Sequence, residues 1–259
     1  MILRRLTANL RTQNWTAIAI EFLIVVIGVF VGTWVANWNQ ERAAKAETER
    51  MVEQLKPQLD TLSAYFVVAR QYYGITRAYS KTAIAGWRND TRVSDRDFVI
   101  AAYQASQINT LGNNGSAWST VLGADRLRDI ADPQMRNDLS FLMSADYSSI
   151  DLPAVDTPYR HNVRRIIPVE IQDAIRARCG DQPNPVPVYS SFTRLPDKCD
   201  LQIAQADAEQ AAAALRAHPE LLQDLQWHIA AIAAFLSNIV PFEMATQRVE
   251  RKIGDRTAA

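Results

Sequence analysis

The most distinctive pattern in the chain is an apolar stretch from Trp15 to Trp38 whose only ionisable residue is Glu21. As an α-helix, Thr16–Ala36 would be about 31 Å long at 1.5 Å per residue, which matches the hydrocarbon thickness of a bilayer. Trp15 lies at one end of the stretch, and Trp34 and Trp38 lie at the other, as expected for aromatic side chains at the two membrane interfaces. The pattern predicts a single transmembrane helix with these three tryptophans as interface anchors.

The residues that flank this helix predict its orientation. Arg4, Arg5 and Arg11 precede it and no acidic residue does. Because basic residues beside a first membrane helix stay on the cytoplasmic side, we expect the N-terminus in the cytoplasm. Basic residues at 42, 45 and 50 reduce this contrast, but the size of the following domain favours the same orientation. We therefore expect a cytoplasmic N-terminus (1–14), a membrane helix (15–38) and a periplasmic helical domain (39–259), held in the bacterial inner (plasma) membrane.

A cleavable signal peptide is the main alternative. Its apolar core would be unusually long, and the nearest small-x-small site, Ala44-Lys45-Ala46, follows Glu41 and Arg42. A signal peptidase site normally comes directly after the apolar core. These features favour an uncleaved signal anchor.

Beyond Gln40 the apolar residues recur every three or four positions, which predicts that the helix continues. Pro57 should interrupt or kink it. The seam has two interpretations: the core face of a helical bundle, which we favour, or a parallel coiled-coil stalk between protomers. Its members are Met51 or Val52, Leu55, Leu59, Leu62, Phe66, Ala69 and Tyr73.

Capping and breaking residues predict further helices and little strand. Ser94 and Asp132-Pro133 have the character of helix N-caps. The expected helices cover about 94–107, 132–147, 169–178, 201–217 and 219–252, and Pro241 should bend the last of them. Residues 113–116 should form a turn before a short helix that ends at Gly123. We expect Leu127 and Ile130 to face inward. The expected fold is all-α: one transmembrane helix that continues into a helical-bundle extracytoplasmic domain.

The balance of charged residues limits the classes of partner that we expect. The chain of 259 residues has 28 basic and 28 acidic residues, so its net charge offers no attraction to nucleic acid. We expect no nucleic-acid partner. The membrane bilayer and other protein chains remain as partners.

The anchor and a later segment resemble a known family. The segment IEFLIVVIGVFVGTWVANWNQER, with WSTVLGADRLRDIADPQMRNDL further on, is similar to uncharacterised bacterial single-pass membrane proteins that share a domain of unknown function. In that family an acid-bearing anchor ends in Asn-Trp-Asn, here Asn37-Trp38-Asn39. This chain departs from the family by carrying Thr33-Trp34 in place of a small-to-aliphatic or Gln-containing stretch. The resemblance covers about the first 150 residues and implies a membrane-anchored helical domain, without implying an activity.

Candidate chemistry is sparse. Cys179 and Cys199 are the only cysteines and flank a Pro-rich segment; in an oxidising compartment they most simply form a disulfide, with two free thiols as the alternative. The histidines at 161, 218 and 228 lack a zinc-binding spacing, and no hydrolase or phosphate-binding motif occurs. We expect no catalytic residue, metal or cofactor. The basic run 160–165 is interpreted as a solvated helix face, with an anionic headgroup or acidic partner as the alternative.

One face of the membrane helix combines unusual residues. At 100° per residue, Gly28 and Gly32 lie about 20° on either side of Glu21, and Asn39 falls on the same line. Gly28 and Gly32 form a GxxxG motif, which lets another helix approach closely in lipid. A carboxylate on that face is protonated or paired with a partner's donor. A chance GxxxG and a Glu21 that reaches the cytoplasmic headgroups are the alternative; we favour a packing face for a second copy or a larger membrane complex.

Three function classes follow. We favour an accessory or structural protein, not an enzyme, that binds other chains through its membrane helix and periplasmic domain. A periplasmic ligand-sensing bundle that acts through a partner is the second class. A periplasmic enzyme is the third, and the sequence supplies no nucleophile-base or metal constellation for it.

Overall fold

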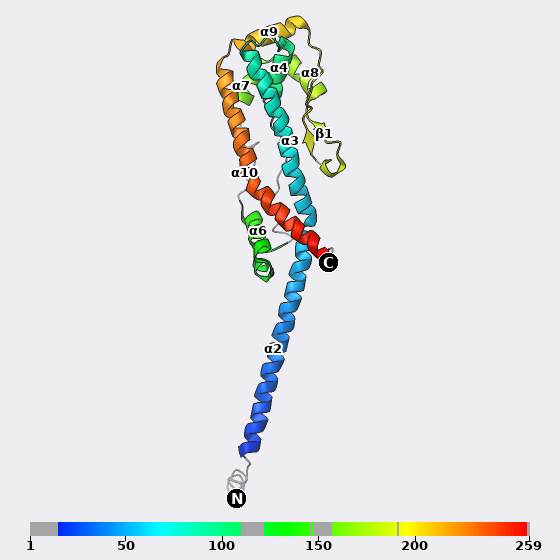
Figure 1. Cartoon of the computed structure of the whole chain (residues 1–259), viewed down its shortest axis with the longest axis vertical. Helices are drawn as coiled ribbons and strands as arrows, with labels where there is room; N and C mark the ends of the chain where they lie inside the picture. Colours follow the sequence, from blue (N-terminus) through cyan, green and yellow to red (C-terminus); the bar gives the residue numbers. More distant parts are fainter. Residues whose placement is uncertain (1–14, 110–121, 146, 148–156, 191, 258–259) are drawn as a thin grey trace.

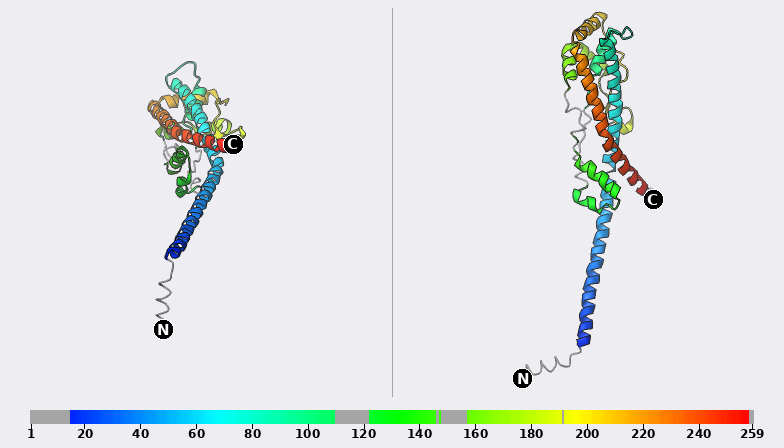
Figure 2. Two further views of the ribbon diagram at one scale, coloured as in Figure 1. Left: turned by 60° about the horizontal axis from the view of Figure 1, so that its bottom comes forward. Right: turned by 60° about the vertical axis from the view of Figure 1, so that its left-hand side comes forward.

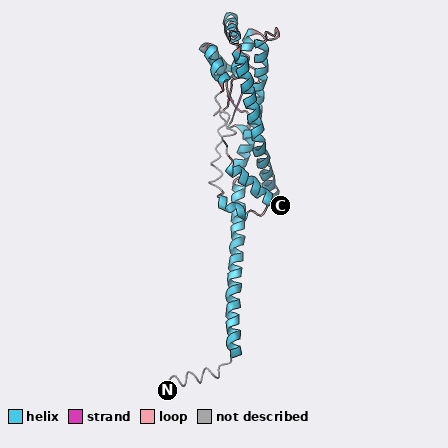
Figure 3. Cartoon of the chain, turned by 90° about the vertical axis from the view of Figure 1, so that its left-hand side faces the viewer, coloured by secondary structure: helices cyan, strands magenta, loops and turns pink. Residues whose placement is uncertain are grey.

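The computed structural model describes residues 15–109, 122–145, 147, 157–190 and 192–257. It is mostly helical, as Figure 3 shows, which agrees with the predicted all-α class. One long helix projects from an elongated domain (Figure 1). The elements in chain order are α2 (Trp15–Gln54), α3 (Lys56–Trp87), α4 (Asp95–Gln104), η1 (Ala124–Asp129), α6 (Pro133–Ser144), α7 (Pro158–Ile166), α8 (Val169–Cys179), β1 (Gln182–Pro183), η4 (Pro187–Tyr189), β2 (Thr193–Arg194), α9 (Gln205–Arg216) and α10 (Glu220–Thr257).

The helices α2 and α3 are separated by Leu55 alone. Pro57 lies in the first turn of α3 and has no N–H to donate to the carbonyl of Glu53, so α2 cannot run on unbroken. Leu55 keeps a right-handed helical backbone, with φ −75° and ψ −13°. The two helices therefore follow one another along the long axis of the molecule (Figure 1), and the predicted interruption at Pro57 is confirmed.

The predicted apolar seam is a core face. Its members at 52, 55, 59, 62, 66, 69 and 73 are at most 5% exposed. They belong to a lower core that also contains α10 side chains from Ile232 to Ile253 and Met135, Leu139 and Leu142 of α6. Both α3 and α6 contact α10 there. Because these side chains are covered within the chain, the seam is not available for a coiled coil between protomers.

A second, upper core lies at the end of the domain that is remote from α2 (Figures 1 and 2). There α4, α7, α8 and α9 gather around the last turns of α3 and the first turns of α10. The helices α3 and α4 approach closely where Phe98, which is fully buried, lies against Gly86. Trp87 packs edge-to-face on the same Phe98 ring, at 5.0 Å between centroids.

The helix α10 belongs to the core, as predicted for its apolar stretch. Ile232, Phe235 and Ile239 are at most 4% exposed and face α3. Pro241 lies inside the helix, and Figure 1 shows α10 changing direction along its length before it ends beside the junction of α2 and α3.

Two ion pairs fasten the last turns of α10 to α6. Arg248 donates from Nε and Nη2 to the carboxylate of Asp138, at 2.9 and 2.6 Å, and Lys252 pairs with Asp132. Burial raises the pKa of Asp138, but the hydrogen bonds from Arg248 and Gln134 outweigh it, and the pKa lies below its usual value. The helix α10 continues to Thr257, beyond the predicted end near residue 252.

The cap predictions are confirmed and several helix ends are not. Ser94 accepts from the N–H of Asp97, and Asp132 accepts from the N–H groups at 134 and 135. However, α4 ends at Gln104 and not near 107, because the chain tightens into i→i−3 turns. The helix α6 ends at Ser144 and not near 147, before an extended Ala145. The helix α9 begins at Gln205 and not at 201. Ile130 is buried and Leu127 partly buried, as predicted; the expected turn at 113–116 and the helix after it lie outside the described residues.

We expect Gly86→Ala to destabilise the protein by about 1–3 kcal/mol, because the added Cβ would lie 2.1 Å from Cδ2 of Phe98 and the core is close-packed. Gly74→Ala is the matched control in the same helix: a Cβ there meets no atom within 4 Å, so it should stabilise by up to about 1 kcal/mol through helix propensity. Urea unfolding of the full chain in mild detergent measures both. Equal effects of the two substitutions would contradict the packing described.

Candidate functional site

The first candidate surface is the N-terminal part of α2. Its large apolar side chains between Ile20 and Val35 are 40% to 75% exposed, and none in its most apolar window is buried. The first buried residue among the described side chains of α2 is Thr48, where Glu47 pairs with Arg126 of η1. A continuous apolar surface of this length is unfavourable in water and marks contact with lipid or protein.

The predicted interface anchors and packing face lie on this exposed helix. Trp34 and Trp38 are 65% and 47% exposed, and the guanidinium of Arg42 lies 4.6 Å above the Trp38 ring. A Cβ at Gly28 or Gly32 would meet no atom within 4 Å. Asn39 is exposed as well, while the side chains of Trp15 and Glu21 lie outside the described part. Contacts within one chain do not test a face for a second chain, so the packing face stays a prediction.

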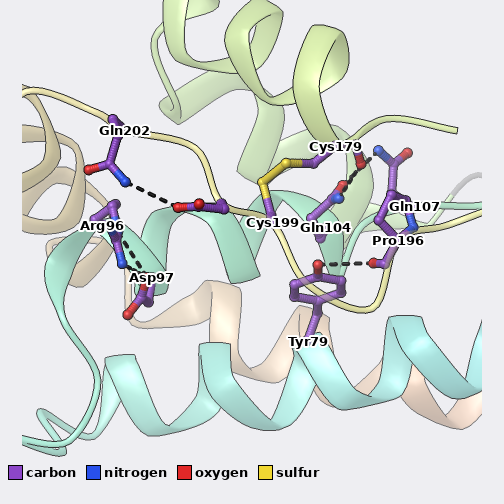
Figure 4. The surroundings of a disulfide bond; sticks show 10 residues. Tyr79, Arg96, Asp97, Gln104, Gln107, Cys179, Pro196, Cys199 and Gln202 are labelled. Atoms are coloured by element: carbon purple, nitrogen blue, oxygen red, sulfur yellow. Dashed lines mark hydrogen bonds and ion pairs between the residues drawn. A yellow bond between two sulfur atoms is a disulfide. The ribbon is translucent and has the colours of Figure 1, made fainter. Parts of the chain in front are cut away.

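The second candidate is the lobe closed by the disulfide between Cys179 and Cys199 (Figure 4). Their Cα atoms are 5.4 Å apart, and the bridge joins the end of α8 to the segment before α9. Within the closed loop β1 and β2 form an antiparallel pair, with Gln182 opposite Arg194. The Pro-rich composition gave no signal for this short pairing.

Polar contacts hold this lobe against α3 and α4. The hydroxyl of Tyr72 donates to Oδ1 of Asp181 at 2.8 Å, and that of Tyr79, two turns on, donates to the carbonyl of Pro196 at 3.0 Å. Gln104 Nε2 donates to the carbonyl of Cys179 at 2.6 Å (Figure 4). The covalent bridge therefore lies within a docked structure and not on a free loop.

The third candidate is a pair of arginines on α7, and it corrects the predicted solvated face. His161 and Arg165 are exposed as predicted, but Arg160 and Arg164 are half-buried. Arg160 Nη1 donates to the carbonyl of Ser106 at 2.8 Å. Two more bonds come from Arg164: Nε donates to Ser106 Oγ at 3.1 Å, and Nη2 donates to Oε1 of Gln107 at 2.9 Å. Sequence spacing could not reveal these acceptors, because they lie more than fifty residues away.

His228 of α10 is fully buried, and its ring packs against Tyr159 of the upper core. Its Nδ1 lies 2.7 Å from the hydroxyl oxygen of Thr157, the N-cap of α7. That oxygen also accepts from the N–H of Arg160, and its own hydrogen is donated to Nδ1 in the tautomer that carries the imidazole proton on Nε2. Nε2 makes no hydrogen bond of normal geometry. Burial and the nearby charge of Arg160 lower the pKa of His228 to about 4, against a weaker opposing effect of the Ala105 backbone.

The other two histidines are surface residues. His161 is exposed, and Nδ1 of exposed His218 lies 2.7 Å from Oε1 of Glu220. Across the described part of the chain, no three His, Cys, Asp or Glu side chains are grouped as metal ligands would be. The candidate sites that remain are the exposed surface of α2, the disulfide lobe and the arginine pair of α7.

We expect acidification from pH 7 to 4 to cost up to about 3 kcal/mol of stability through His228. The unfolded imidazole binds a proton below its usual pKa of 6.5, whereas the folded one does so only near 4, so protonation favours the unfolded state between these values. His228→Asn, which keeps an acceptor for Thr157, should remove that part of the pH dependence even if it lowers stability at pH 7. Urea unfolding at both pH values measures the difference.

The matched control for this experiment is His161→Asn, because His161 is exposed on the neighbouring helix α7. It should retain the pH dependence of the unmodified protein. If His228→Asn retains it as well, the assignment to His228 is wrong.

The comparisons with known proteins give no relative. No protein-family model, curated protein or solved structure matches the chain. The family resemblance of the anchor stays a prediction.

Proposed function

We propose that this chain is a bitopic membrane-anchored accessory protein that binds other protein chains through its membrane helix and its extracytoplasmic helical domain. The observation that carries the proposal is the exposed apolar surface of α2, which no described part of the domain covers. It is continuous with a folded domain whose first buried residue, Thr48, follows Trp38 by ten positions, or about 15 Å of helix. The domain would therefore stand directly above the membrane surface.

Two features support an orientation with the domain in the bacterial periplasm. The arginines at 4, 5 and 11 favour a cytoplasmic N-terminus. The disulfide between Cys179 and Cys199 is compatible with an oxidising compartment on the other side.

The outer face of α10 supports the second part of the proposal, protein binding by the domain. No Asp, Glu, Lys or Arg occurs from 225 to 242. Trp227 lies within this stretch and is 51% exposed, and Met244, two residues beyond it, is 52% exposed. Exposed aromatic and Met side chains are enriched where proteins meet. A periplasmic ligand-sensing bundle is the second candidate, and the half-buried arginine pair of α7 is the observation that favours it.

The disulfide offers a test of the compartment. Peptide mapping of the protein isolated from membranes without reduction should recover the peptides of Cys179 and Cys199 linked to each other, because the periplasm is oxidising and the cytoplasm is not. An alkaline phosphatase fused after the last residue should be active in the same cells. Both cysteines alkylated before reduction, or an inactive fusion, would contradict a periplasmic domain.

The membrane face offers a test of partner binding. Gly28→Ile with Gly32→Ile should abolish cross-linking or co-purification of partner chains in mild detergent, because the added side chains block the close approach of a second helix. They should leave the fold intact, since neither position contacts the rest of the chain. The matched control is Val29→Ile with Val31→Ile, at exposed positions between the glycines. Equal recovery with the two double variants would refute the packing face.

A further inference from the structure

Arg160 and Arg164 place two positive charges one turn apart on α7, in a half-buried position. Like charges at this spacing repel one another, and burial makes each more costly. Burial is the main cause that lowers the pKa of Arg164, and the charge of Arg160 adds to it. A protein normally offsets such a pair with carboxylates.

No carboxylate of the described residues forms an ion pair with either guanidinium, although ten ion pairs of other Lys or Arg side chains occur in the same residues. Within the described residues, three hydrogen bonds from these guanidinium groups go to neutral oxygens of Ser106 and Gln107. Two guanidinium groups carry ten N–H donors, and these bonds use three of them. The C-terminal end of α4 lies beside them, and its helix dipole supplies only about half a negative charge.

Among the described acids, Asp181 acts on this pair but does not complete the site. Its carboxylate accepts from the hydroxyl of Tyr72, and Arg160 and Arg164 affect it through electrostatics beyond ion-pair distance. Burial of that carboxyl raises its pKa, against the effects of Tyr72 and the two arginines. As a residue Asp181 is exposed, which places this cluster at the surface of the domain and within reach of solutes.

We propose that Arg160 and Arg164 form a binding site for a soluble oxyanion, a carboxylate or a phosphate. The planar guanidinium fork matches both anions with paired N–H···O bonds. The stacking of Arg164 on the Tyr103 ring, at 4.8 Å from its centroid, holds one fork in place before binding. The fixed negative charge of Asp181 repels the bound anion and lowers its affinity.

The position of the site excludes headgroups of the anchoring membrane as the ligand. From Trp38 to Leu55 and from Leu55 to Tyr72 the chain runs seventeen residues of helix each, about 50 Å in all. Figure 1 shows α7 at the end of the domain remote from the N-terminus. The inference goes beyond the proposed accessory role, and only the exclusion of headgroups rests on α2 as the membrane helix.

The test titrates the full chain in mild detergent with sodium phosphate and with sodium succinate, at constant ionic strength in chloride, by isothermal calorimetry. We expect saturable binding of at least one of them. Arg160→Gln with Arg164→Gln should weaken it by about tenfold or more, since hydrogen bonds to charged groups are lost. Arg165→Gln with Arg178→Gln, both exposed, removes the same net charge and should change the affinity less than about twofold. Absence of saturable binding, or equal loss in the two double variants, overturns the site.

If the first double variant does not keep the circular dichroism of the unmodified protein, Asp181→Asn decides the matter. Asparagine still accepts from Tyr72 but removes the opposing charge, so the oxyanion should bind several-fold more tightly. Unchanged or weaker affinity would overturn the proposal.

Discussion

The contact between α3 and α10 is the interaction on which the rest of the domain depends. Both helices run through the lower and upper cores, and Tyr73 of one packs edge-to-face on Phe235 of the other, 5.2 Å between ring centroids. Each smaller helix completes a core that this pair begins: α6 closes the lower one, and α4, α7, α8 and α9 close the upper one. Burial along so long a contact stabilises an elongated domain that short helices alone would not support.

The lengthwise arrangement separates the functions that we propose. The end near α2 is fastened by ion pairs, with Arg248 and Lys252 holding α10 to α6. The remote end carries the disulfide lobe and the arginine pair, and it is linked to α3 by the hydroxyls of Tyr72 and Tyr79. An anchor at one pole and a polar surface at the other suit a protein that presents a site away from the membrane.

Local signals predicted the elements well, and distant contacts account for what they missed. Ser94 and Asp132 identify helix starts because a cap acts within three residues. The late start of α9 reflects a non-local cause, since Leu201 and the disulfide-bonded Cys199 pack on the upper core in an extended segment. Arg160 and Arg164 look like solvated residues in the sequence because their acceptors lie in the turns that follow α4. The candidate site therefore emerges only when the fold brings α7 to those turns.

Burial, and not hydropathy, distinguishes the two helices of the described residues that are apolar and long enough to cross a membrane. In α10 a third of the most apolar window is buried, and its interior side chains complete the lower core. Removing α10 to a bilayer would expose the facing side of α3, including Phe66 and Tyr73, to water. In α2 the corresponding window has no buried residue, so lipid can cover it without any loss of packing. The same driving force, removal of apolar surface from water, thus assigns α10 to the protein core and favours α2 as the single membrane anchor.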